Sequence, residues 1–274
     1  MKSYSYKVFT KNKNGGNPAV VVFGDGFNVE DLEKKARSID AYLTVFILPE
    51  ESRPDSVRLR FFGRKGEMDF CGHGILAAGY TYAQKSGKSD FLFETNVKTV
   101  ALTVSNDSLV QFLTEKIDLS EEPSINKDDI LHRFGINPRV IDFSSPFSVA
   151  SIGSPKLLVP IIDLQSLWHL EFDLAALEKW SAETKVNGAY FYCLETVNKD
   201  SLAHARGFNP LLSKSEDAGT GVAAGALVEL LKGKSSAGSG DYVIEQGDVV
   251  GAKCEVYVSL RQDYIKVGGF VTPA

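Results

Sequence analysis

The sequence predicts an α+β protein made of two pseudo-symmetric lobes, and three features predict it. Short segments rich in Val, Phe and Tyr recur between turn residues, which is typical of β-strands. A few longer segments repeat apolar residues at helical spacing. A motif of one arginine, an aromatic residue, a polar loop, an acidic residue and two closely spaced glycines occurs twice, about half the chain apart, which indicates duplicated lobes.

The composition excludes several functional classes. The 274 residues are 43% hydrophobic and 24% charged, as in ordinary globular proteins. The net charge of −5, without a run of Lys or Arg, argues against a nucleic-acid partner. Cys71, Cys193 and Cys254 are far apart and form no CxxC pair, so neither a disulfide framework nor a zinc site is expected. We expect a cytoplasmic protein without a membrane partner, because no signal-like or membrane-spanning apolar segment occurs.

Strands and helices follow from local patterns. Two amphipathic helices are expected, over Val29–Ser38 after the N-cap Asn28 and over Leu174–Ala182 after the N-cap Asp173. Two helices rich in small residues, over Gly72–Ala83 and Gly219–Leu231, are expected to be buried. The expected strands include Tyr4–Phe9, Ala19–Phe23, Val57–Phe62, Thr99–Val104 and Leu109–Leu113.

The internal repeat sets the expected lobes. RFFGRKGEMDFCGHGILAAG, at residues 60–79, matches RGFNPLLSKSEDAGTGVAAGA, at residues 206–226. We expect an N-terminal lobe over residues 1–118 and a C-terminal lobe over residues 119–274, with the polar segment Ser120–Ser124 at their boundary. Chance similarity between two glycine- and alanine-rich helix starts is the alternative.

Both copies place glycines at the start of a helix. Glycine lets a ligand approach the backbone closely, and the first N–H groups of a helix attract a carboxylate or phosphate. Two such starts would grip an acidic small molecule in a cleft between the lobes. The alternative is that the glycines only permit close packing of the helix against a sheet.

Polar side chains at these helix starts are the candidate catalytic groups. His73 lies between two glycines, where its ring would reach a ligand. Asp217 precedes the second pair of glycines. Its carboxyl group would exchange a proton with the ligand, or its negative charge would only stabilise the helix through the helix dipole. Cys71 would act as a nucleophile or base, although a free cysteine is more often a small buried hydrophobe.

Several segments, in order along the whole chain, resemble the PhzF (phenazine biosynthesis-like) family. They are GGNPAVVVF at 15–23, EMDFCGHG at 67–74, SIGSPKLLV at 151–159, EDAGTGVAAGAL at 216–227, IEQGDVVG at 244–251 and VGGF at 267–270. The resemblance implies a diaminopimelate epimerase-like fold, in which a barrel-like β-sheet wraps around a central helix in each lobe. It also implies a homodimer and a cofactor-free isomerisation, by proton transfer, of a small amino acid, dihydro-hydroxyanthranilate.

The resemblance also assigns residues to the site. It implies that His73 and Asp217 lie in the site, where they would act as the proton-transfer groups of an isomerase. The glycines and threonine of the two motifs would line the site: Gly72, Gly74, Gly219, Thr220 and Gly221.

The chain departs from the family pattern at the position of the catalytic general base. The family's general-base glutamate aligns with Leu43, which cannot take a proton, so Glu67 or Cys71 would have to act instead. Val222 replaces a small polar residue, which suggests an altered, less polar pocket. Ala218 stands where a two-cysteine racemase would carry its second thiol, so that reaction is disfavoured.

Three functions therefore remain open at this point. The first is a PhzF-like isomerase acting on a small carboxylate-bearing metabolite, in biosynthesis. The second is a repurposed enzyme of secondary metabolism that catalyses a cyclisation or dehydration, with Asp217 as an acid. The third is a metabolite-binding protein without catalysis. None of the three calls for a metal or cofactor, since no cluster has ligand spacing.

Overall fold

The structure, a computed structural model, describes residues 2–24, 28–49, 57–115, 125–212, 216–232 and 238–274. It divides into two compact units, residues 1–114 with 268–274 and residues 115–267. The expected lobe boundary between residues 118 and 119, with the polar segment Ser120–Ser124, lies outside the described residues. The last residues of the chain belong to the first unit because Tyr6 pairs with Pro273 and Val8 with Val271.

The first unit is a closed β-barrel. Its strands follow the order β1-β2-β3-β4-β6-β7-β8-β16, and β16 also pairs with β1, which closes the ring. The short strand β5 pairs with β4. The strands are β1 (Ser3–Val8), β2 (Asn17–Phe23), β3 (Leu43–Pro49), β4 (Val57–Gly63), β5 (Gly66–Met68), β6 (Asp90–Glu94), β7 (Thr99–Val104), β8 (Leu109–Glu115) and the C-terminal part of β16 (Tyr264–Pro273).

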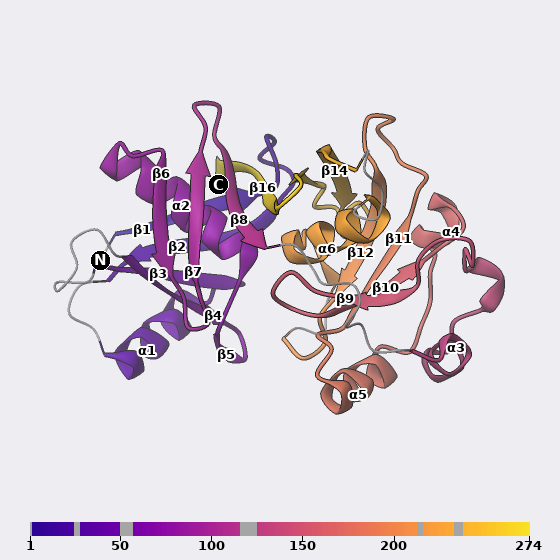
Figure 1. The fold of residues 1–274 in the computed structure, drawn as a ribbon. Helices are drawn as coiled ribbons and strands as arrows, with labels where there is room; N and C mark the ends of the chain where they lie inside the picture. The colour runs from indigo at the N-terminus through magenta and orange to yellow at the C-terminus, as the bar shows by residue number, and fades with distance from the viewer. Residues whose placement is uncertain (1, 25–27, 50–56, 116–124, 213–215, 233–237) are drawn as a thin grey trace. The chain divides into compact units, whose positions relative to one another are not determined.

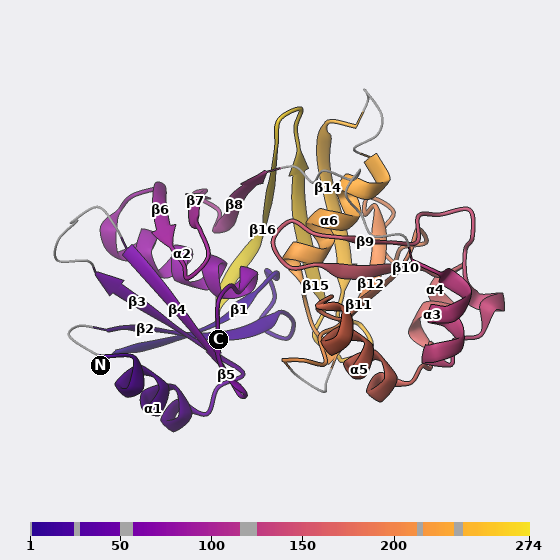
Figure 2. The ribbon, with the colours of Figure 1, turned by 60° about the horizontal axis from the view of Figure 1, so that its bottom comes forward.

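The helix α2 (Gly72–Ser86) forms the centre of this barrel (Figures 1 and 2). Its glycines let the strands approach closely. A Cβ on Gly74 would lie 3.0 Å from side-chain atoms of Leu43 and Phe61, and a Cβ on Gly79 would lie 2.7 Å from Leu102. The prediction of a buried helix over Gly72–Ala83 is confirmed, because the small residues of this segment are what fits inside the barrel.

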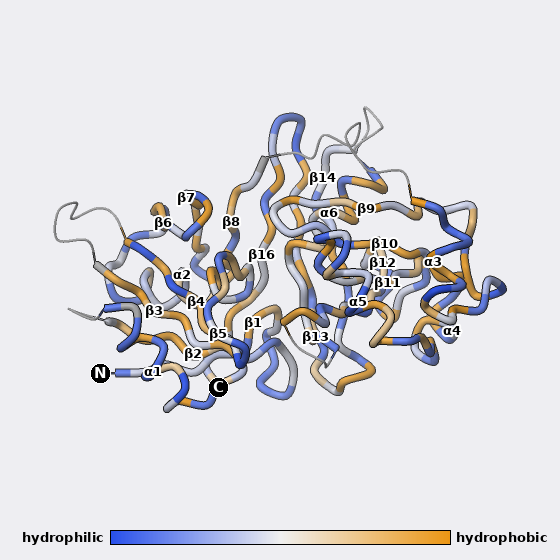
Figure 3. Tube along the Cα trace, turned by 90° about the horizontal axis from the view of Figure 1, so that it is seen from below, coloured by the Kyte–Doolittle hydropathy of each residue, from blue (hydrophilic) through white to orange (hydrophobic). Residues whose placement is uncertain are grey.

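The helix α1 (Val29–Ile39) covers the outside of the sheet. The Asn28 side chain accepts the backbone N–H of Asp31 at 2.9 Å, which confirms the predicted N-cap. Leu32 packs into a cluster with Phe46 and Phe62, and Ala36 and Ile39 of the same helix pack against that cluster. Blue and orange segments alternate along α1 in Figure 3, as expected of an amphipathic helix.

The second unit repeats the order of the first. Its strands follow the order β9-β10-β11-β12-β14-β15, with β13 paired to β12. The buried helix α6 (Gly221–Lys232) connects β13 to β14, as α2 connects β5 to β6. The strands are β9 (Ser148–Ala150), β10 (Lys156–Pro160), β11 (Ala189–Cys193), β12 (Ala203–Phe208), β13 (Glu216–Asp217), β14 (Gly240–Gln246) and β15 (Cys254–Leu260).

The strand pairings establish that the two units are copies of one fold. In the first unit β4 runs antiparallel to β3 and β5 and parallel to β6. In the second unit β12 runs antiparallel to β11 and β13 and parallel to β14. Likewise, β2 is parallel to β3, and β10 is parallel to β11. The predicted fold class, two related lobes built of a strand sheet around a central helix, is confirmed.

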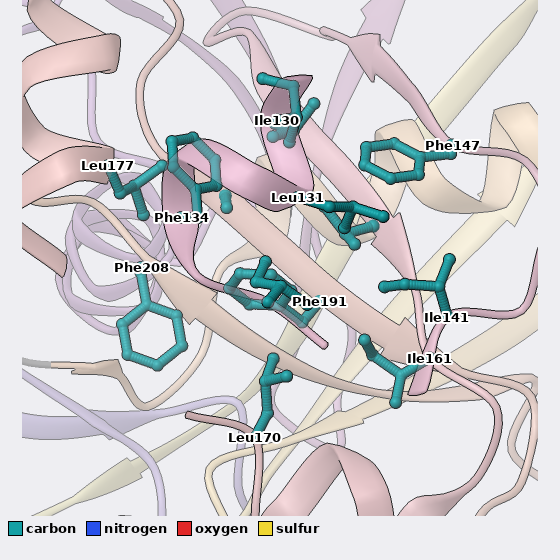
Figure 4. Packing of buried hydrophobic residues seen from close by; sticks show 14 of the residues in the cluster. Ile130, Leu131, Phe134, Ile141, Phe147, Ile161, Leu170, Leu177, Phe191 and Phe208 are labelled. Atoms are coloured by element: carbon teal, nitrogen blue, oxygen red, sulfur yellow. The ribbon is translucent and has the colours of Figure 1, made fainter. Parts of the chain in front are cut away.

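A large apolar cluster covers the outer face of the second sheet (Figure 4). The helices α3 (Lys127–Phe134) and α5 (Leu174–Thr184) contribute to it, and the Phe134 and Trp180 rings meet edge to face at 5.7 Å. The Asp173 side chain caps α5 by accepting two backbone N–H groups, which confirms that N-cap. The second unit also contains the short helix α4 (Leu164–Trp168) and the 3₁₀ turn η2 (Pro138–Val140).

Candidate active site

The start of α2 brings a thiol and an imidazole together. Cys71 occupies the N-cap position, and its carbonyl accepts the Ile75 N–H at 2.9 Å. The Cys71 Sγ lies 3.5 Å from the His73 Nδ1, and both residues are half-buried. Gly72 and Gly74, on either side of His73, are buried in the first turn. An imidazole at this distance can receive the thiol proton, and a helix N-terminus stabilises the resulting thiolate.

Leu43 lies beside this helix start. It is the first residue of β3, 1% exposed, and pairs with Gly63. Its Cδ2 lies 3.0 Å from where a Cβ on Gly74 would be, so its side chain packs against the first turn of α2. The preceding residue, Tyr42, places its ring 6.3 Å from the His73 ring. The position that the resemblance assigns to a glutamate therefore holds a buried apolar side chain, which packs against Gly74 in the first turn of α2.

Glu67 is committed to an ion pair. Both Glu67 oxygens accept from the Arg60 guanidinium, the Nη2–Oε2 bond being 2.6 Å, and Asn96 Nδ2 donates to Oε1 at 3.0 Å. The hydrogen bond from Arg60 holds the pKa of Glu67 below its ordinary value despite some burial. A carboxylate stabilised in this way is a weaker proton acceptor, so Glu67 is poorly suited to replace the missing base.

The second helix start holds Asp217 in place. Asp217 ends β13, and its Oδ2 accepts the Thr220 hydroxyl at 2.7 Å. The Thr220 carbonyl accepts the Ala224 N–H at 3.0 Å, so Thr220 stands at the N-cap of α6, which begins two residues later than the predicted Gly219. Gly219 and Gly221 are buried, and Val222, 7% exposed, is buried within the first turn of α6.

A buried polar network surrounds Asp217. Gln246 Nε2 donates to the Asp217 carbonyl at 2.6 Å, and the Tyr190 hydroxyl donates to Gln246 Oε1 at 3.0 Å. Burial, together with the charge of Asp217, raises the pKa of the Tyr190 hydroxyl well above its ordinary value. Tyr190 therefore stays a neutral hydrogen-bond donor at physiological pH.

Lys156 is a buried cation in the same unit. It is 3% exposed, and its ammonium donates to the backbone carbonyls of Asn187 and Phe208. Burial lowers its pKa to about 8, although the negative charge of Asp217 opposes this shift. Because the two residues interact electrostatically, Lys156 provides a positive charge near the candidate acid–base group.

The structure groups the predicted residues into two sets and leaves one apart. Cys71 and His73 are in contact at the start of α2, where Leu43 packs against Gly74, whereas Asp217 and Thr220 are in contact at the start of α6. Glu67 lies in the β4–β5 hairpin before α2, where it pairs with Arg60. The Arg206–Glu216 ion pair lies in the corresponding β12–β13 hairpin before α6.

Sequence reasoning missed Gln246, Tyr190 and Lys156. The first and last lie within the family-like segments IEQGDVVG and SIGSPKLLV, which was the available signal.

His204, outside the two helix starts, is held by structural partners. His204, completely buried, contacts Glu245 Oε2 through Nδ1 at 2.9 Å and accepts the Trp168 indole N–H at 3.2 Å, so it is a satisfied core residue. Across the described ranges, no group of three or more His, Cys, Asp or Glu side chains is arranged to hold a metal ion. Among the same residues, no helix has both the length and the apolar character needed to cross a membrane.

The chain is similar to known proteins over its whole length. The sequence model of the family described as phenazine biosynthesis-like protein, PhzC-PhzF, matches residues 6–270. A protein of Mesorhizobium japonicum named an uncharacterized isomerase is 30% identical over 237 residues, covering 81% of this chain and 77% of its own. The trans-2,3-dihydro-3-hydroxyanthranilate isomerase of Pseudomonas chlororaphis is 24% identical over 216 residues, covering 77% of this chain and 73% of its own.

A solved structure shares the fold. The Bacillus anthracis phenazine biosynthesis protein of the PhzF family superposes with a TM-score of 0.83 at 23% identity, covering 100% of this chain and 98% of that protein.

Proposed function

The chain belongs to the phenazine biosynthesis-like (PhzC-PhzF) family, and we propose that it is an isomerase that moves a proton on a small carboxylate-bearing metabolite without a cofactor. The prediction of an isomerase is confirmed by the relatives, which carry that name. The substrate class and the chemistry are the proposal.

The Cys71–His73 contact carries the proposal. Leu43 cannot act as a base, and Glu67 is held by Arg60, so the thiol is the remaining candidate at the α2 start. His73 takes the thiol proton, and the Cys71 thiolate then removes a proton from a substrate carbon. Asp217, whose carboxyl group is held by the Thr220 hydroxyl, is proposed as the acid that returns a proton to the substrate when the new C–H bond forms.

The reaction is balanced within the substrate. One C–H bond breaks, the electron pair shifts along the conjugated system, and a new C–H bond forms at another carbon. No electron acceptor is needed, because the substrate and product are isomers. Backbone N–H groups at a helix start would stabilise the negative charge that develops on the substrate during the shift.

The proposal is tested by turnover of trans-2,3-dihydro-3-hydroxyanthranilate in D₂O. Wild-type protein is expected to form the isomer with deuterium at the new C–H position. Cys71→Ala and Asp217→Asn are each expected to lower kcat by about 10²–10⁴-fold, the usual contribution of a general acid or base. Turnover by Cys71→Ala at the wild-type rate would show that the thiol is not the base.

An exposed-site control is available on the same lobe. Glu33→Gln removes only a surface pair with Arg37 on α1 and is expected to leave turnover unchanged. If the wild type itself is inert towards this compound, the substrate assignment is wrong and other small carboxylates should be screened.

A further inference from the structure

Gln246 is a buried amide whose hydrogen bonds all converge on the α6 start. It ends β14, is fully buried, and lies opposite Ala205 of β12. Oε1 accepts the Thr220 N–H at 3.0 Å and the Tyr190 hydroxyl at 3.0 Å. Nε2 donates to the Asp217 carbonyl at 2.6 Å and to Thr220 Oγ1 at 3.2 Å. A buried amide is tolerated when it is satisfied in this way.

The hydrogen bonds have only one consistent direction. The Thr220 backbone N–H can only donate, so Gln246 must present its oxygen there and its amino group to the Asp217 carbonyl. The amino group also donates to Thr220 Oγ1, and the hydroxyl proton of Thr220 is then directed at Asp217 Oδ2. The chain of donors runs from Gln246 through Thr220 to the Asp217 carboxylate.

Gly207 leaves the space that this network needs. It pairs with Asp217 across β12 and β13. A Cβ at this position would lie 2.7 Å from Thr220 Oγ1 and 2.8 Å from Gln246 Nε2. Any side chain larger than a hydrogen would therefore displace the two groups that orient Asp217. The network thus depends on a residue in each of four strands, β11 to β14, and on the helix N-cap.

We propose that Gln246 is a positioning residue of the isomerase, which fixes the Asp217 carboxylate by orienting the Thr220 hydroxyl and the end of β13. The inference rests on the proposed function for its link to catalysis. Gln246 is fully buried, so it is expected to act only through Thr220 and the backbone. Small displacements of a catalytic group slow the chemical step strongly, while substrate binding changes little.

The test compares Gln246→Met with wild type, using trans-2,3-dihydro-3-hydroxyanthranilate as the substrate. Methionine keeps the length of the side chain but removes all four hydrogen bonds. The expected result is a kcat about 100-fold lower with KM within about twofold, the pattern of a misplaced catalytic group. A folded Gln246→Met protein with wild-type kcat would overturn the proposal.

Two further variants separate positioning from general damage. Gly207→Ala displaces the same network without altering Gln246, so it should reproduce the fall in kcat even if Gln246→Met does not fold. Tyr242→Phe, on the same strand, removes a hydroxyl bond to the Gly238 carbonyl and should leave kcat unchanged. A wild-type kcat in Gly207→Ala, or an equal loss in Tyr242→Phe, would contradict the proposal.

A measurement without substrate separates this inference from the proposed function. If wild type does not turn over the compound, crystal structures of wild type and Gln246→Met are compared. The expected difference is loss of the 2.7 Å contact between Thr220 Oγ1 and Asp217 Oδ2 in the variant. An unchanged contact in the variant would overturn the positioning role, whatever the substrate proves to be.

Discussion

The stability of the protein is expected to rise with pH because of Lys156. Its ammonium is 3% exposed, and burial lowers its pKa from 10.5 to about 8. Below pH 8 the Lys156 ammonium is charged in both the folded and the unfolded state. Folding must then remove this charge from water, which lowers the free energy of unfolding. Between pH 8 and 10.5 the folded lysine loses its proton first, and the free energy of unfolding rises.

The magnitude follows from the size of the pKa shift. A difference of roughly 2.5 units at about 1.36 kcal/mol per unit corresponds to about 3 kcal/mol. The assay is urea unfolding of wild type and Lys156→Met at constant ionic strength between pH 7 and pH 10.5. Subtracting the free energy of unfolding of the variant from that of wild type at each pH removes the contributions of the tyrosines and cysteines that also titrate in this range.

The free energy of unfolding of wild type relative to the variant is expected to increase by about 3 kcal/mol across that range. A difference that stays flat with pH would refute the buried-ammonium argument.

Three other outcomes are expected. Gly225→Ala should destabilise the protein by about 1–3 kcal/mol in urea unfolding, because its Cβ would lie 2.3 Å from the Ile152 Cδ1. In the native protein, a thiol reagent followed by mass spectrometry should label Cys71 first, since Cys193 is buried and burial raises its pKa to about 12. Asn28→Ala should cost about 1 kcal/mol of stability, measured the same way, because it removes the cap of α1. Equal stabilities, or first labelling at Cys193, would contradict these expectations.

Local chemistry made part of the fold predictable. Asn28 and Asp173 have short oxygen-bearing side chains before amphipathic segments, and each caps its helix as expected. The repeated glycine motifs predicted the two buried helices, because small residues in a row leave few alternatives to close packing. These features depend on neighbours in sequence.

Long-range pairing was less accessible from the sequence. Nothing in the segment Gly268–Ala274 indicates that it joins the first barrel, since the pairing of Tyr6 with Pro273 links the two ends of the chain. The ion pair between Glu67 and Arg60 forms because β5 pairs with β4 in a hairpin. Strand β5 has only three residues, too few for a sequence pattern to predict it. Strand register, not composition, decides both contacts.

The candidate site was predicted only in part for the same reason. His73, Cys71 and Asp217 stand next to glycines that mark them. Gln246 lies on a strand far along the chain from the aspartate whose carbonyl accepts its amide hydrogen bond. The burial of Lys156 likewise follows from the strands around it, and its charge alone favoured an exposed position.

The central claim is that the thiol of Cys71 stands in for a glutamate at position 43. The most direct measurement is deuterium incorporation into trans-2,3-dihydro-3-hydroxyanthranilate by wild type, Cys71→Ala and the double variant Cys71→Ala with Leu43→Glu. Leu43 packs against the first turn of α2, so a glutamate there would face the same helix start. The account predicts that wild type is active, Cys71→Ala is inactive and the double variant regains activity. Wild-type activity in Cys71→Ala would contradict it.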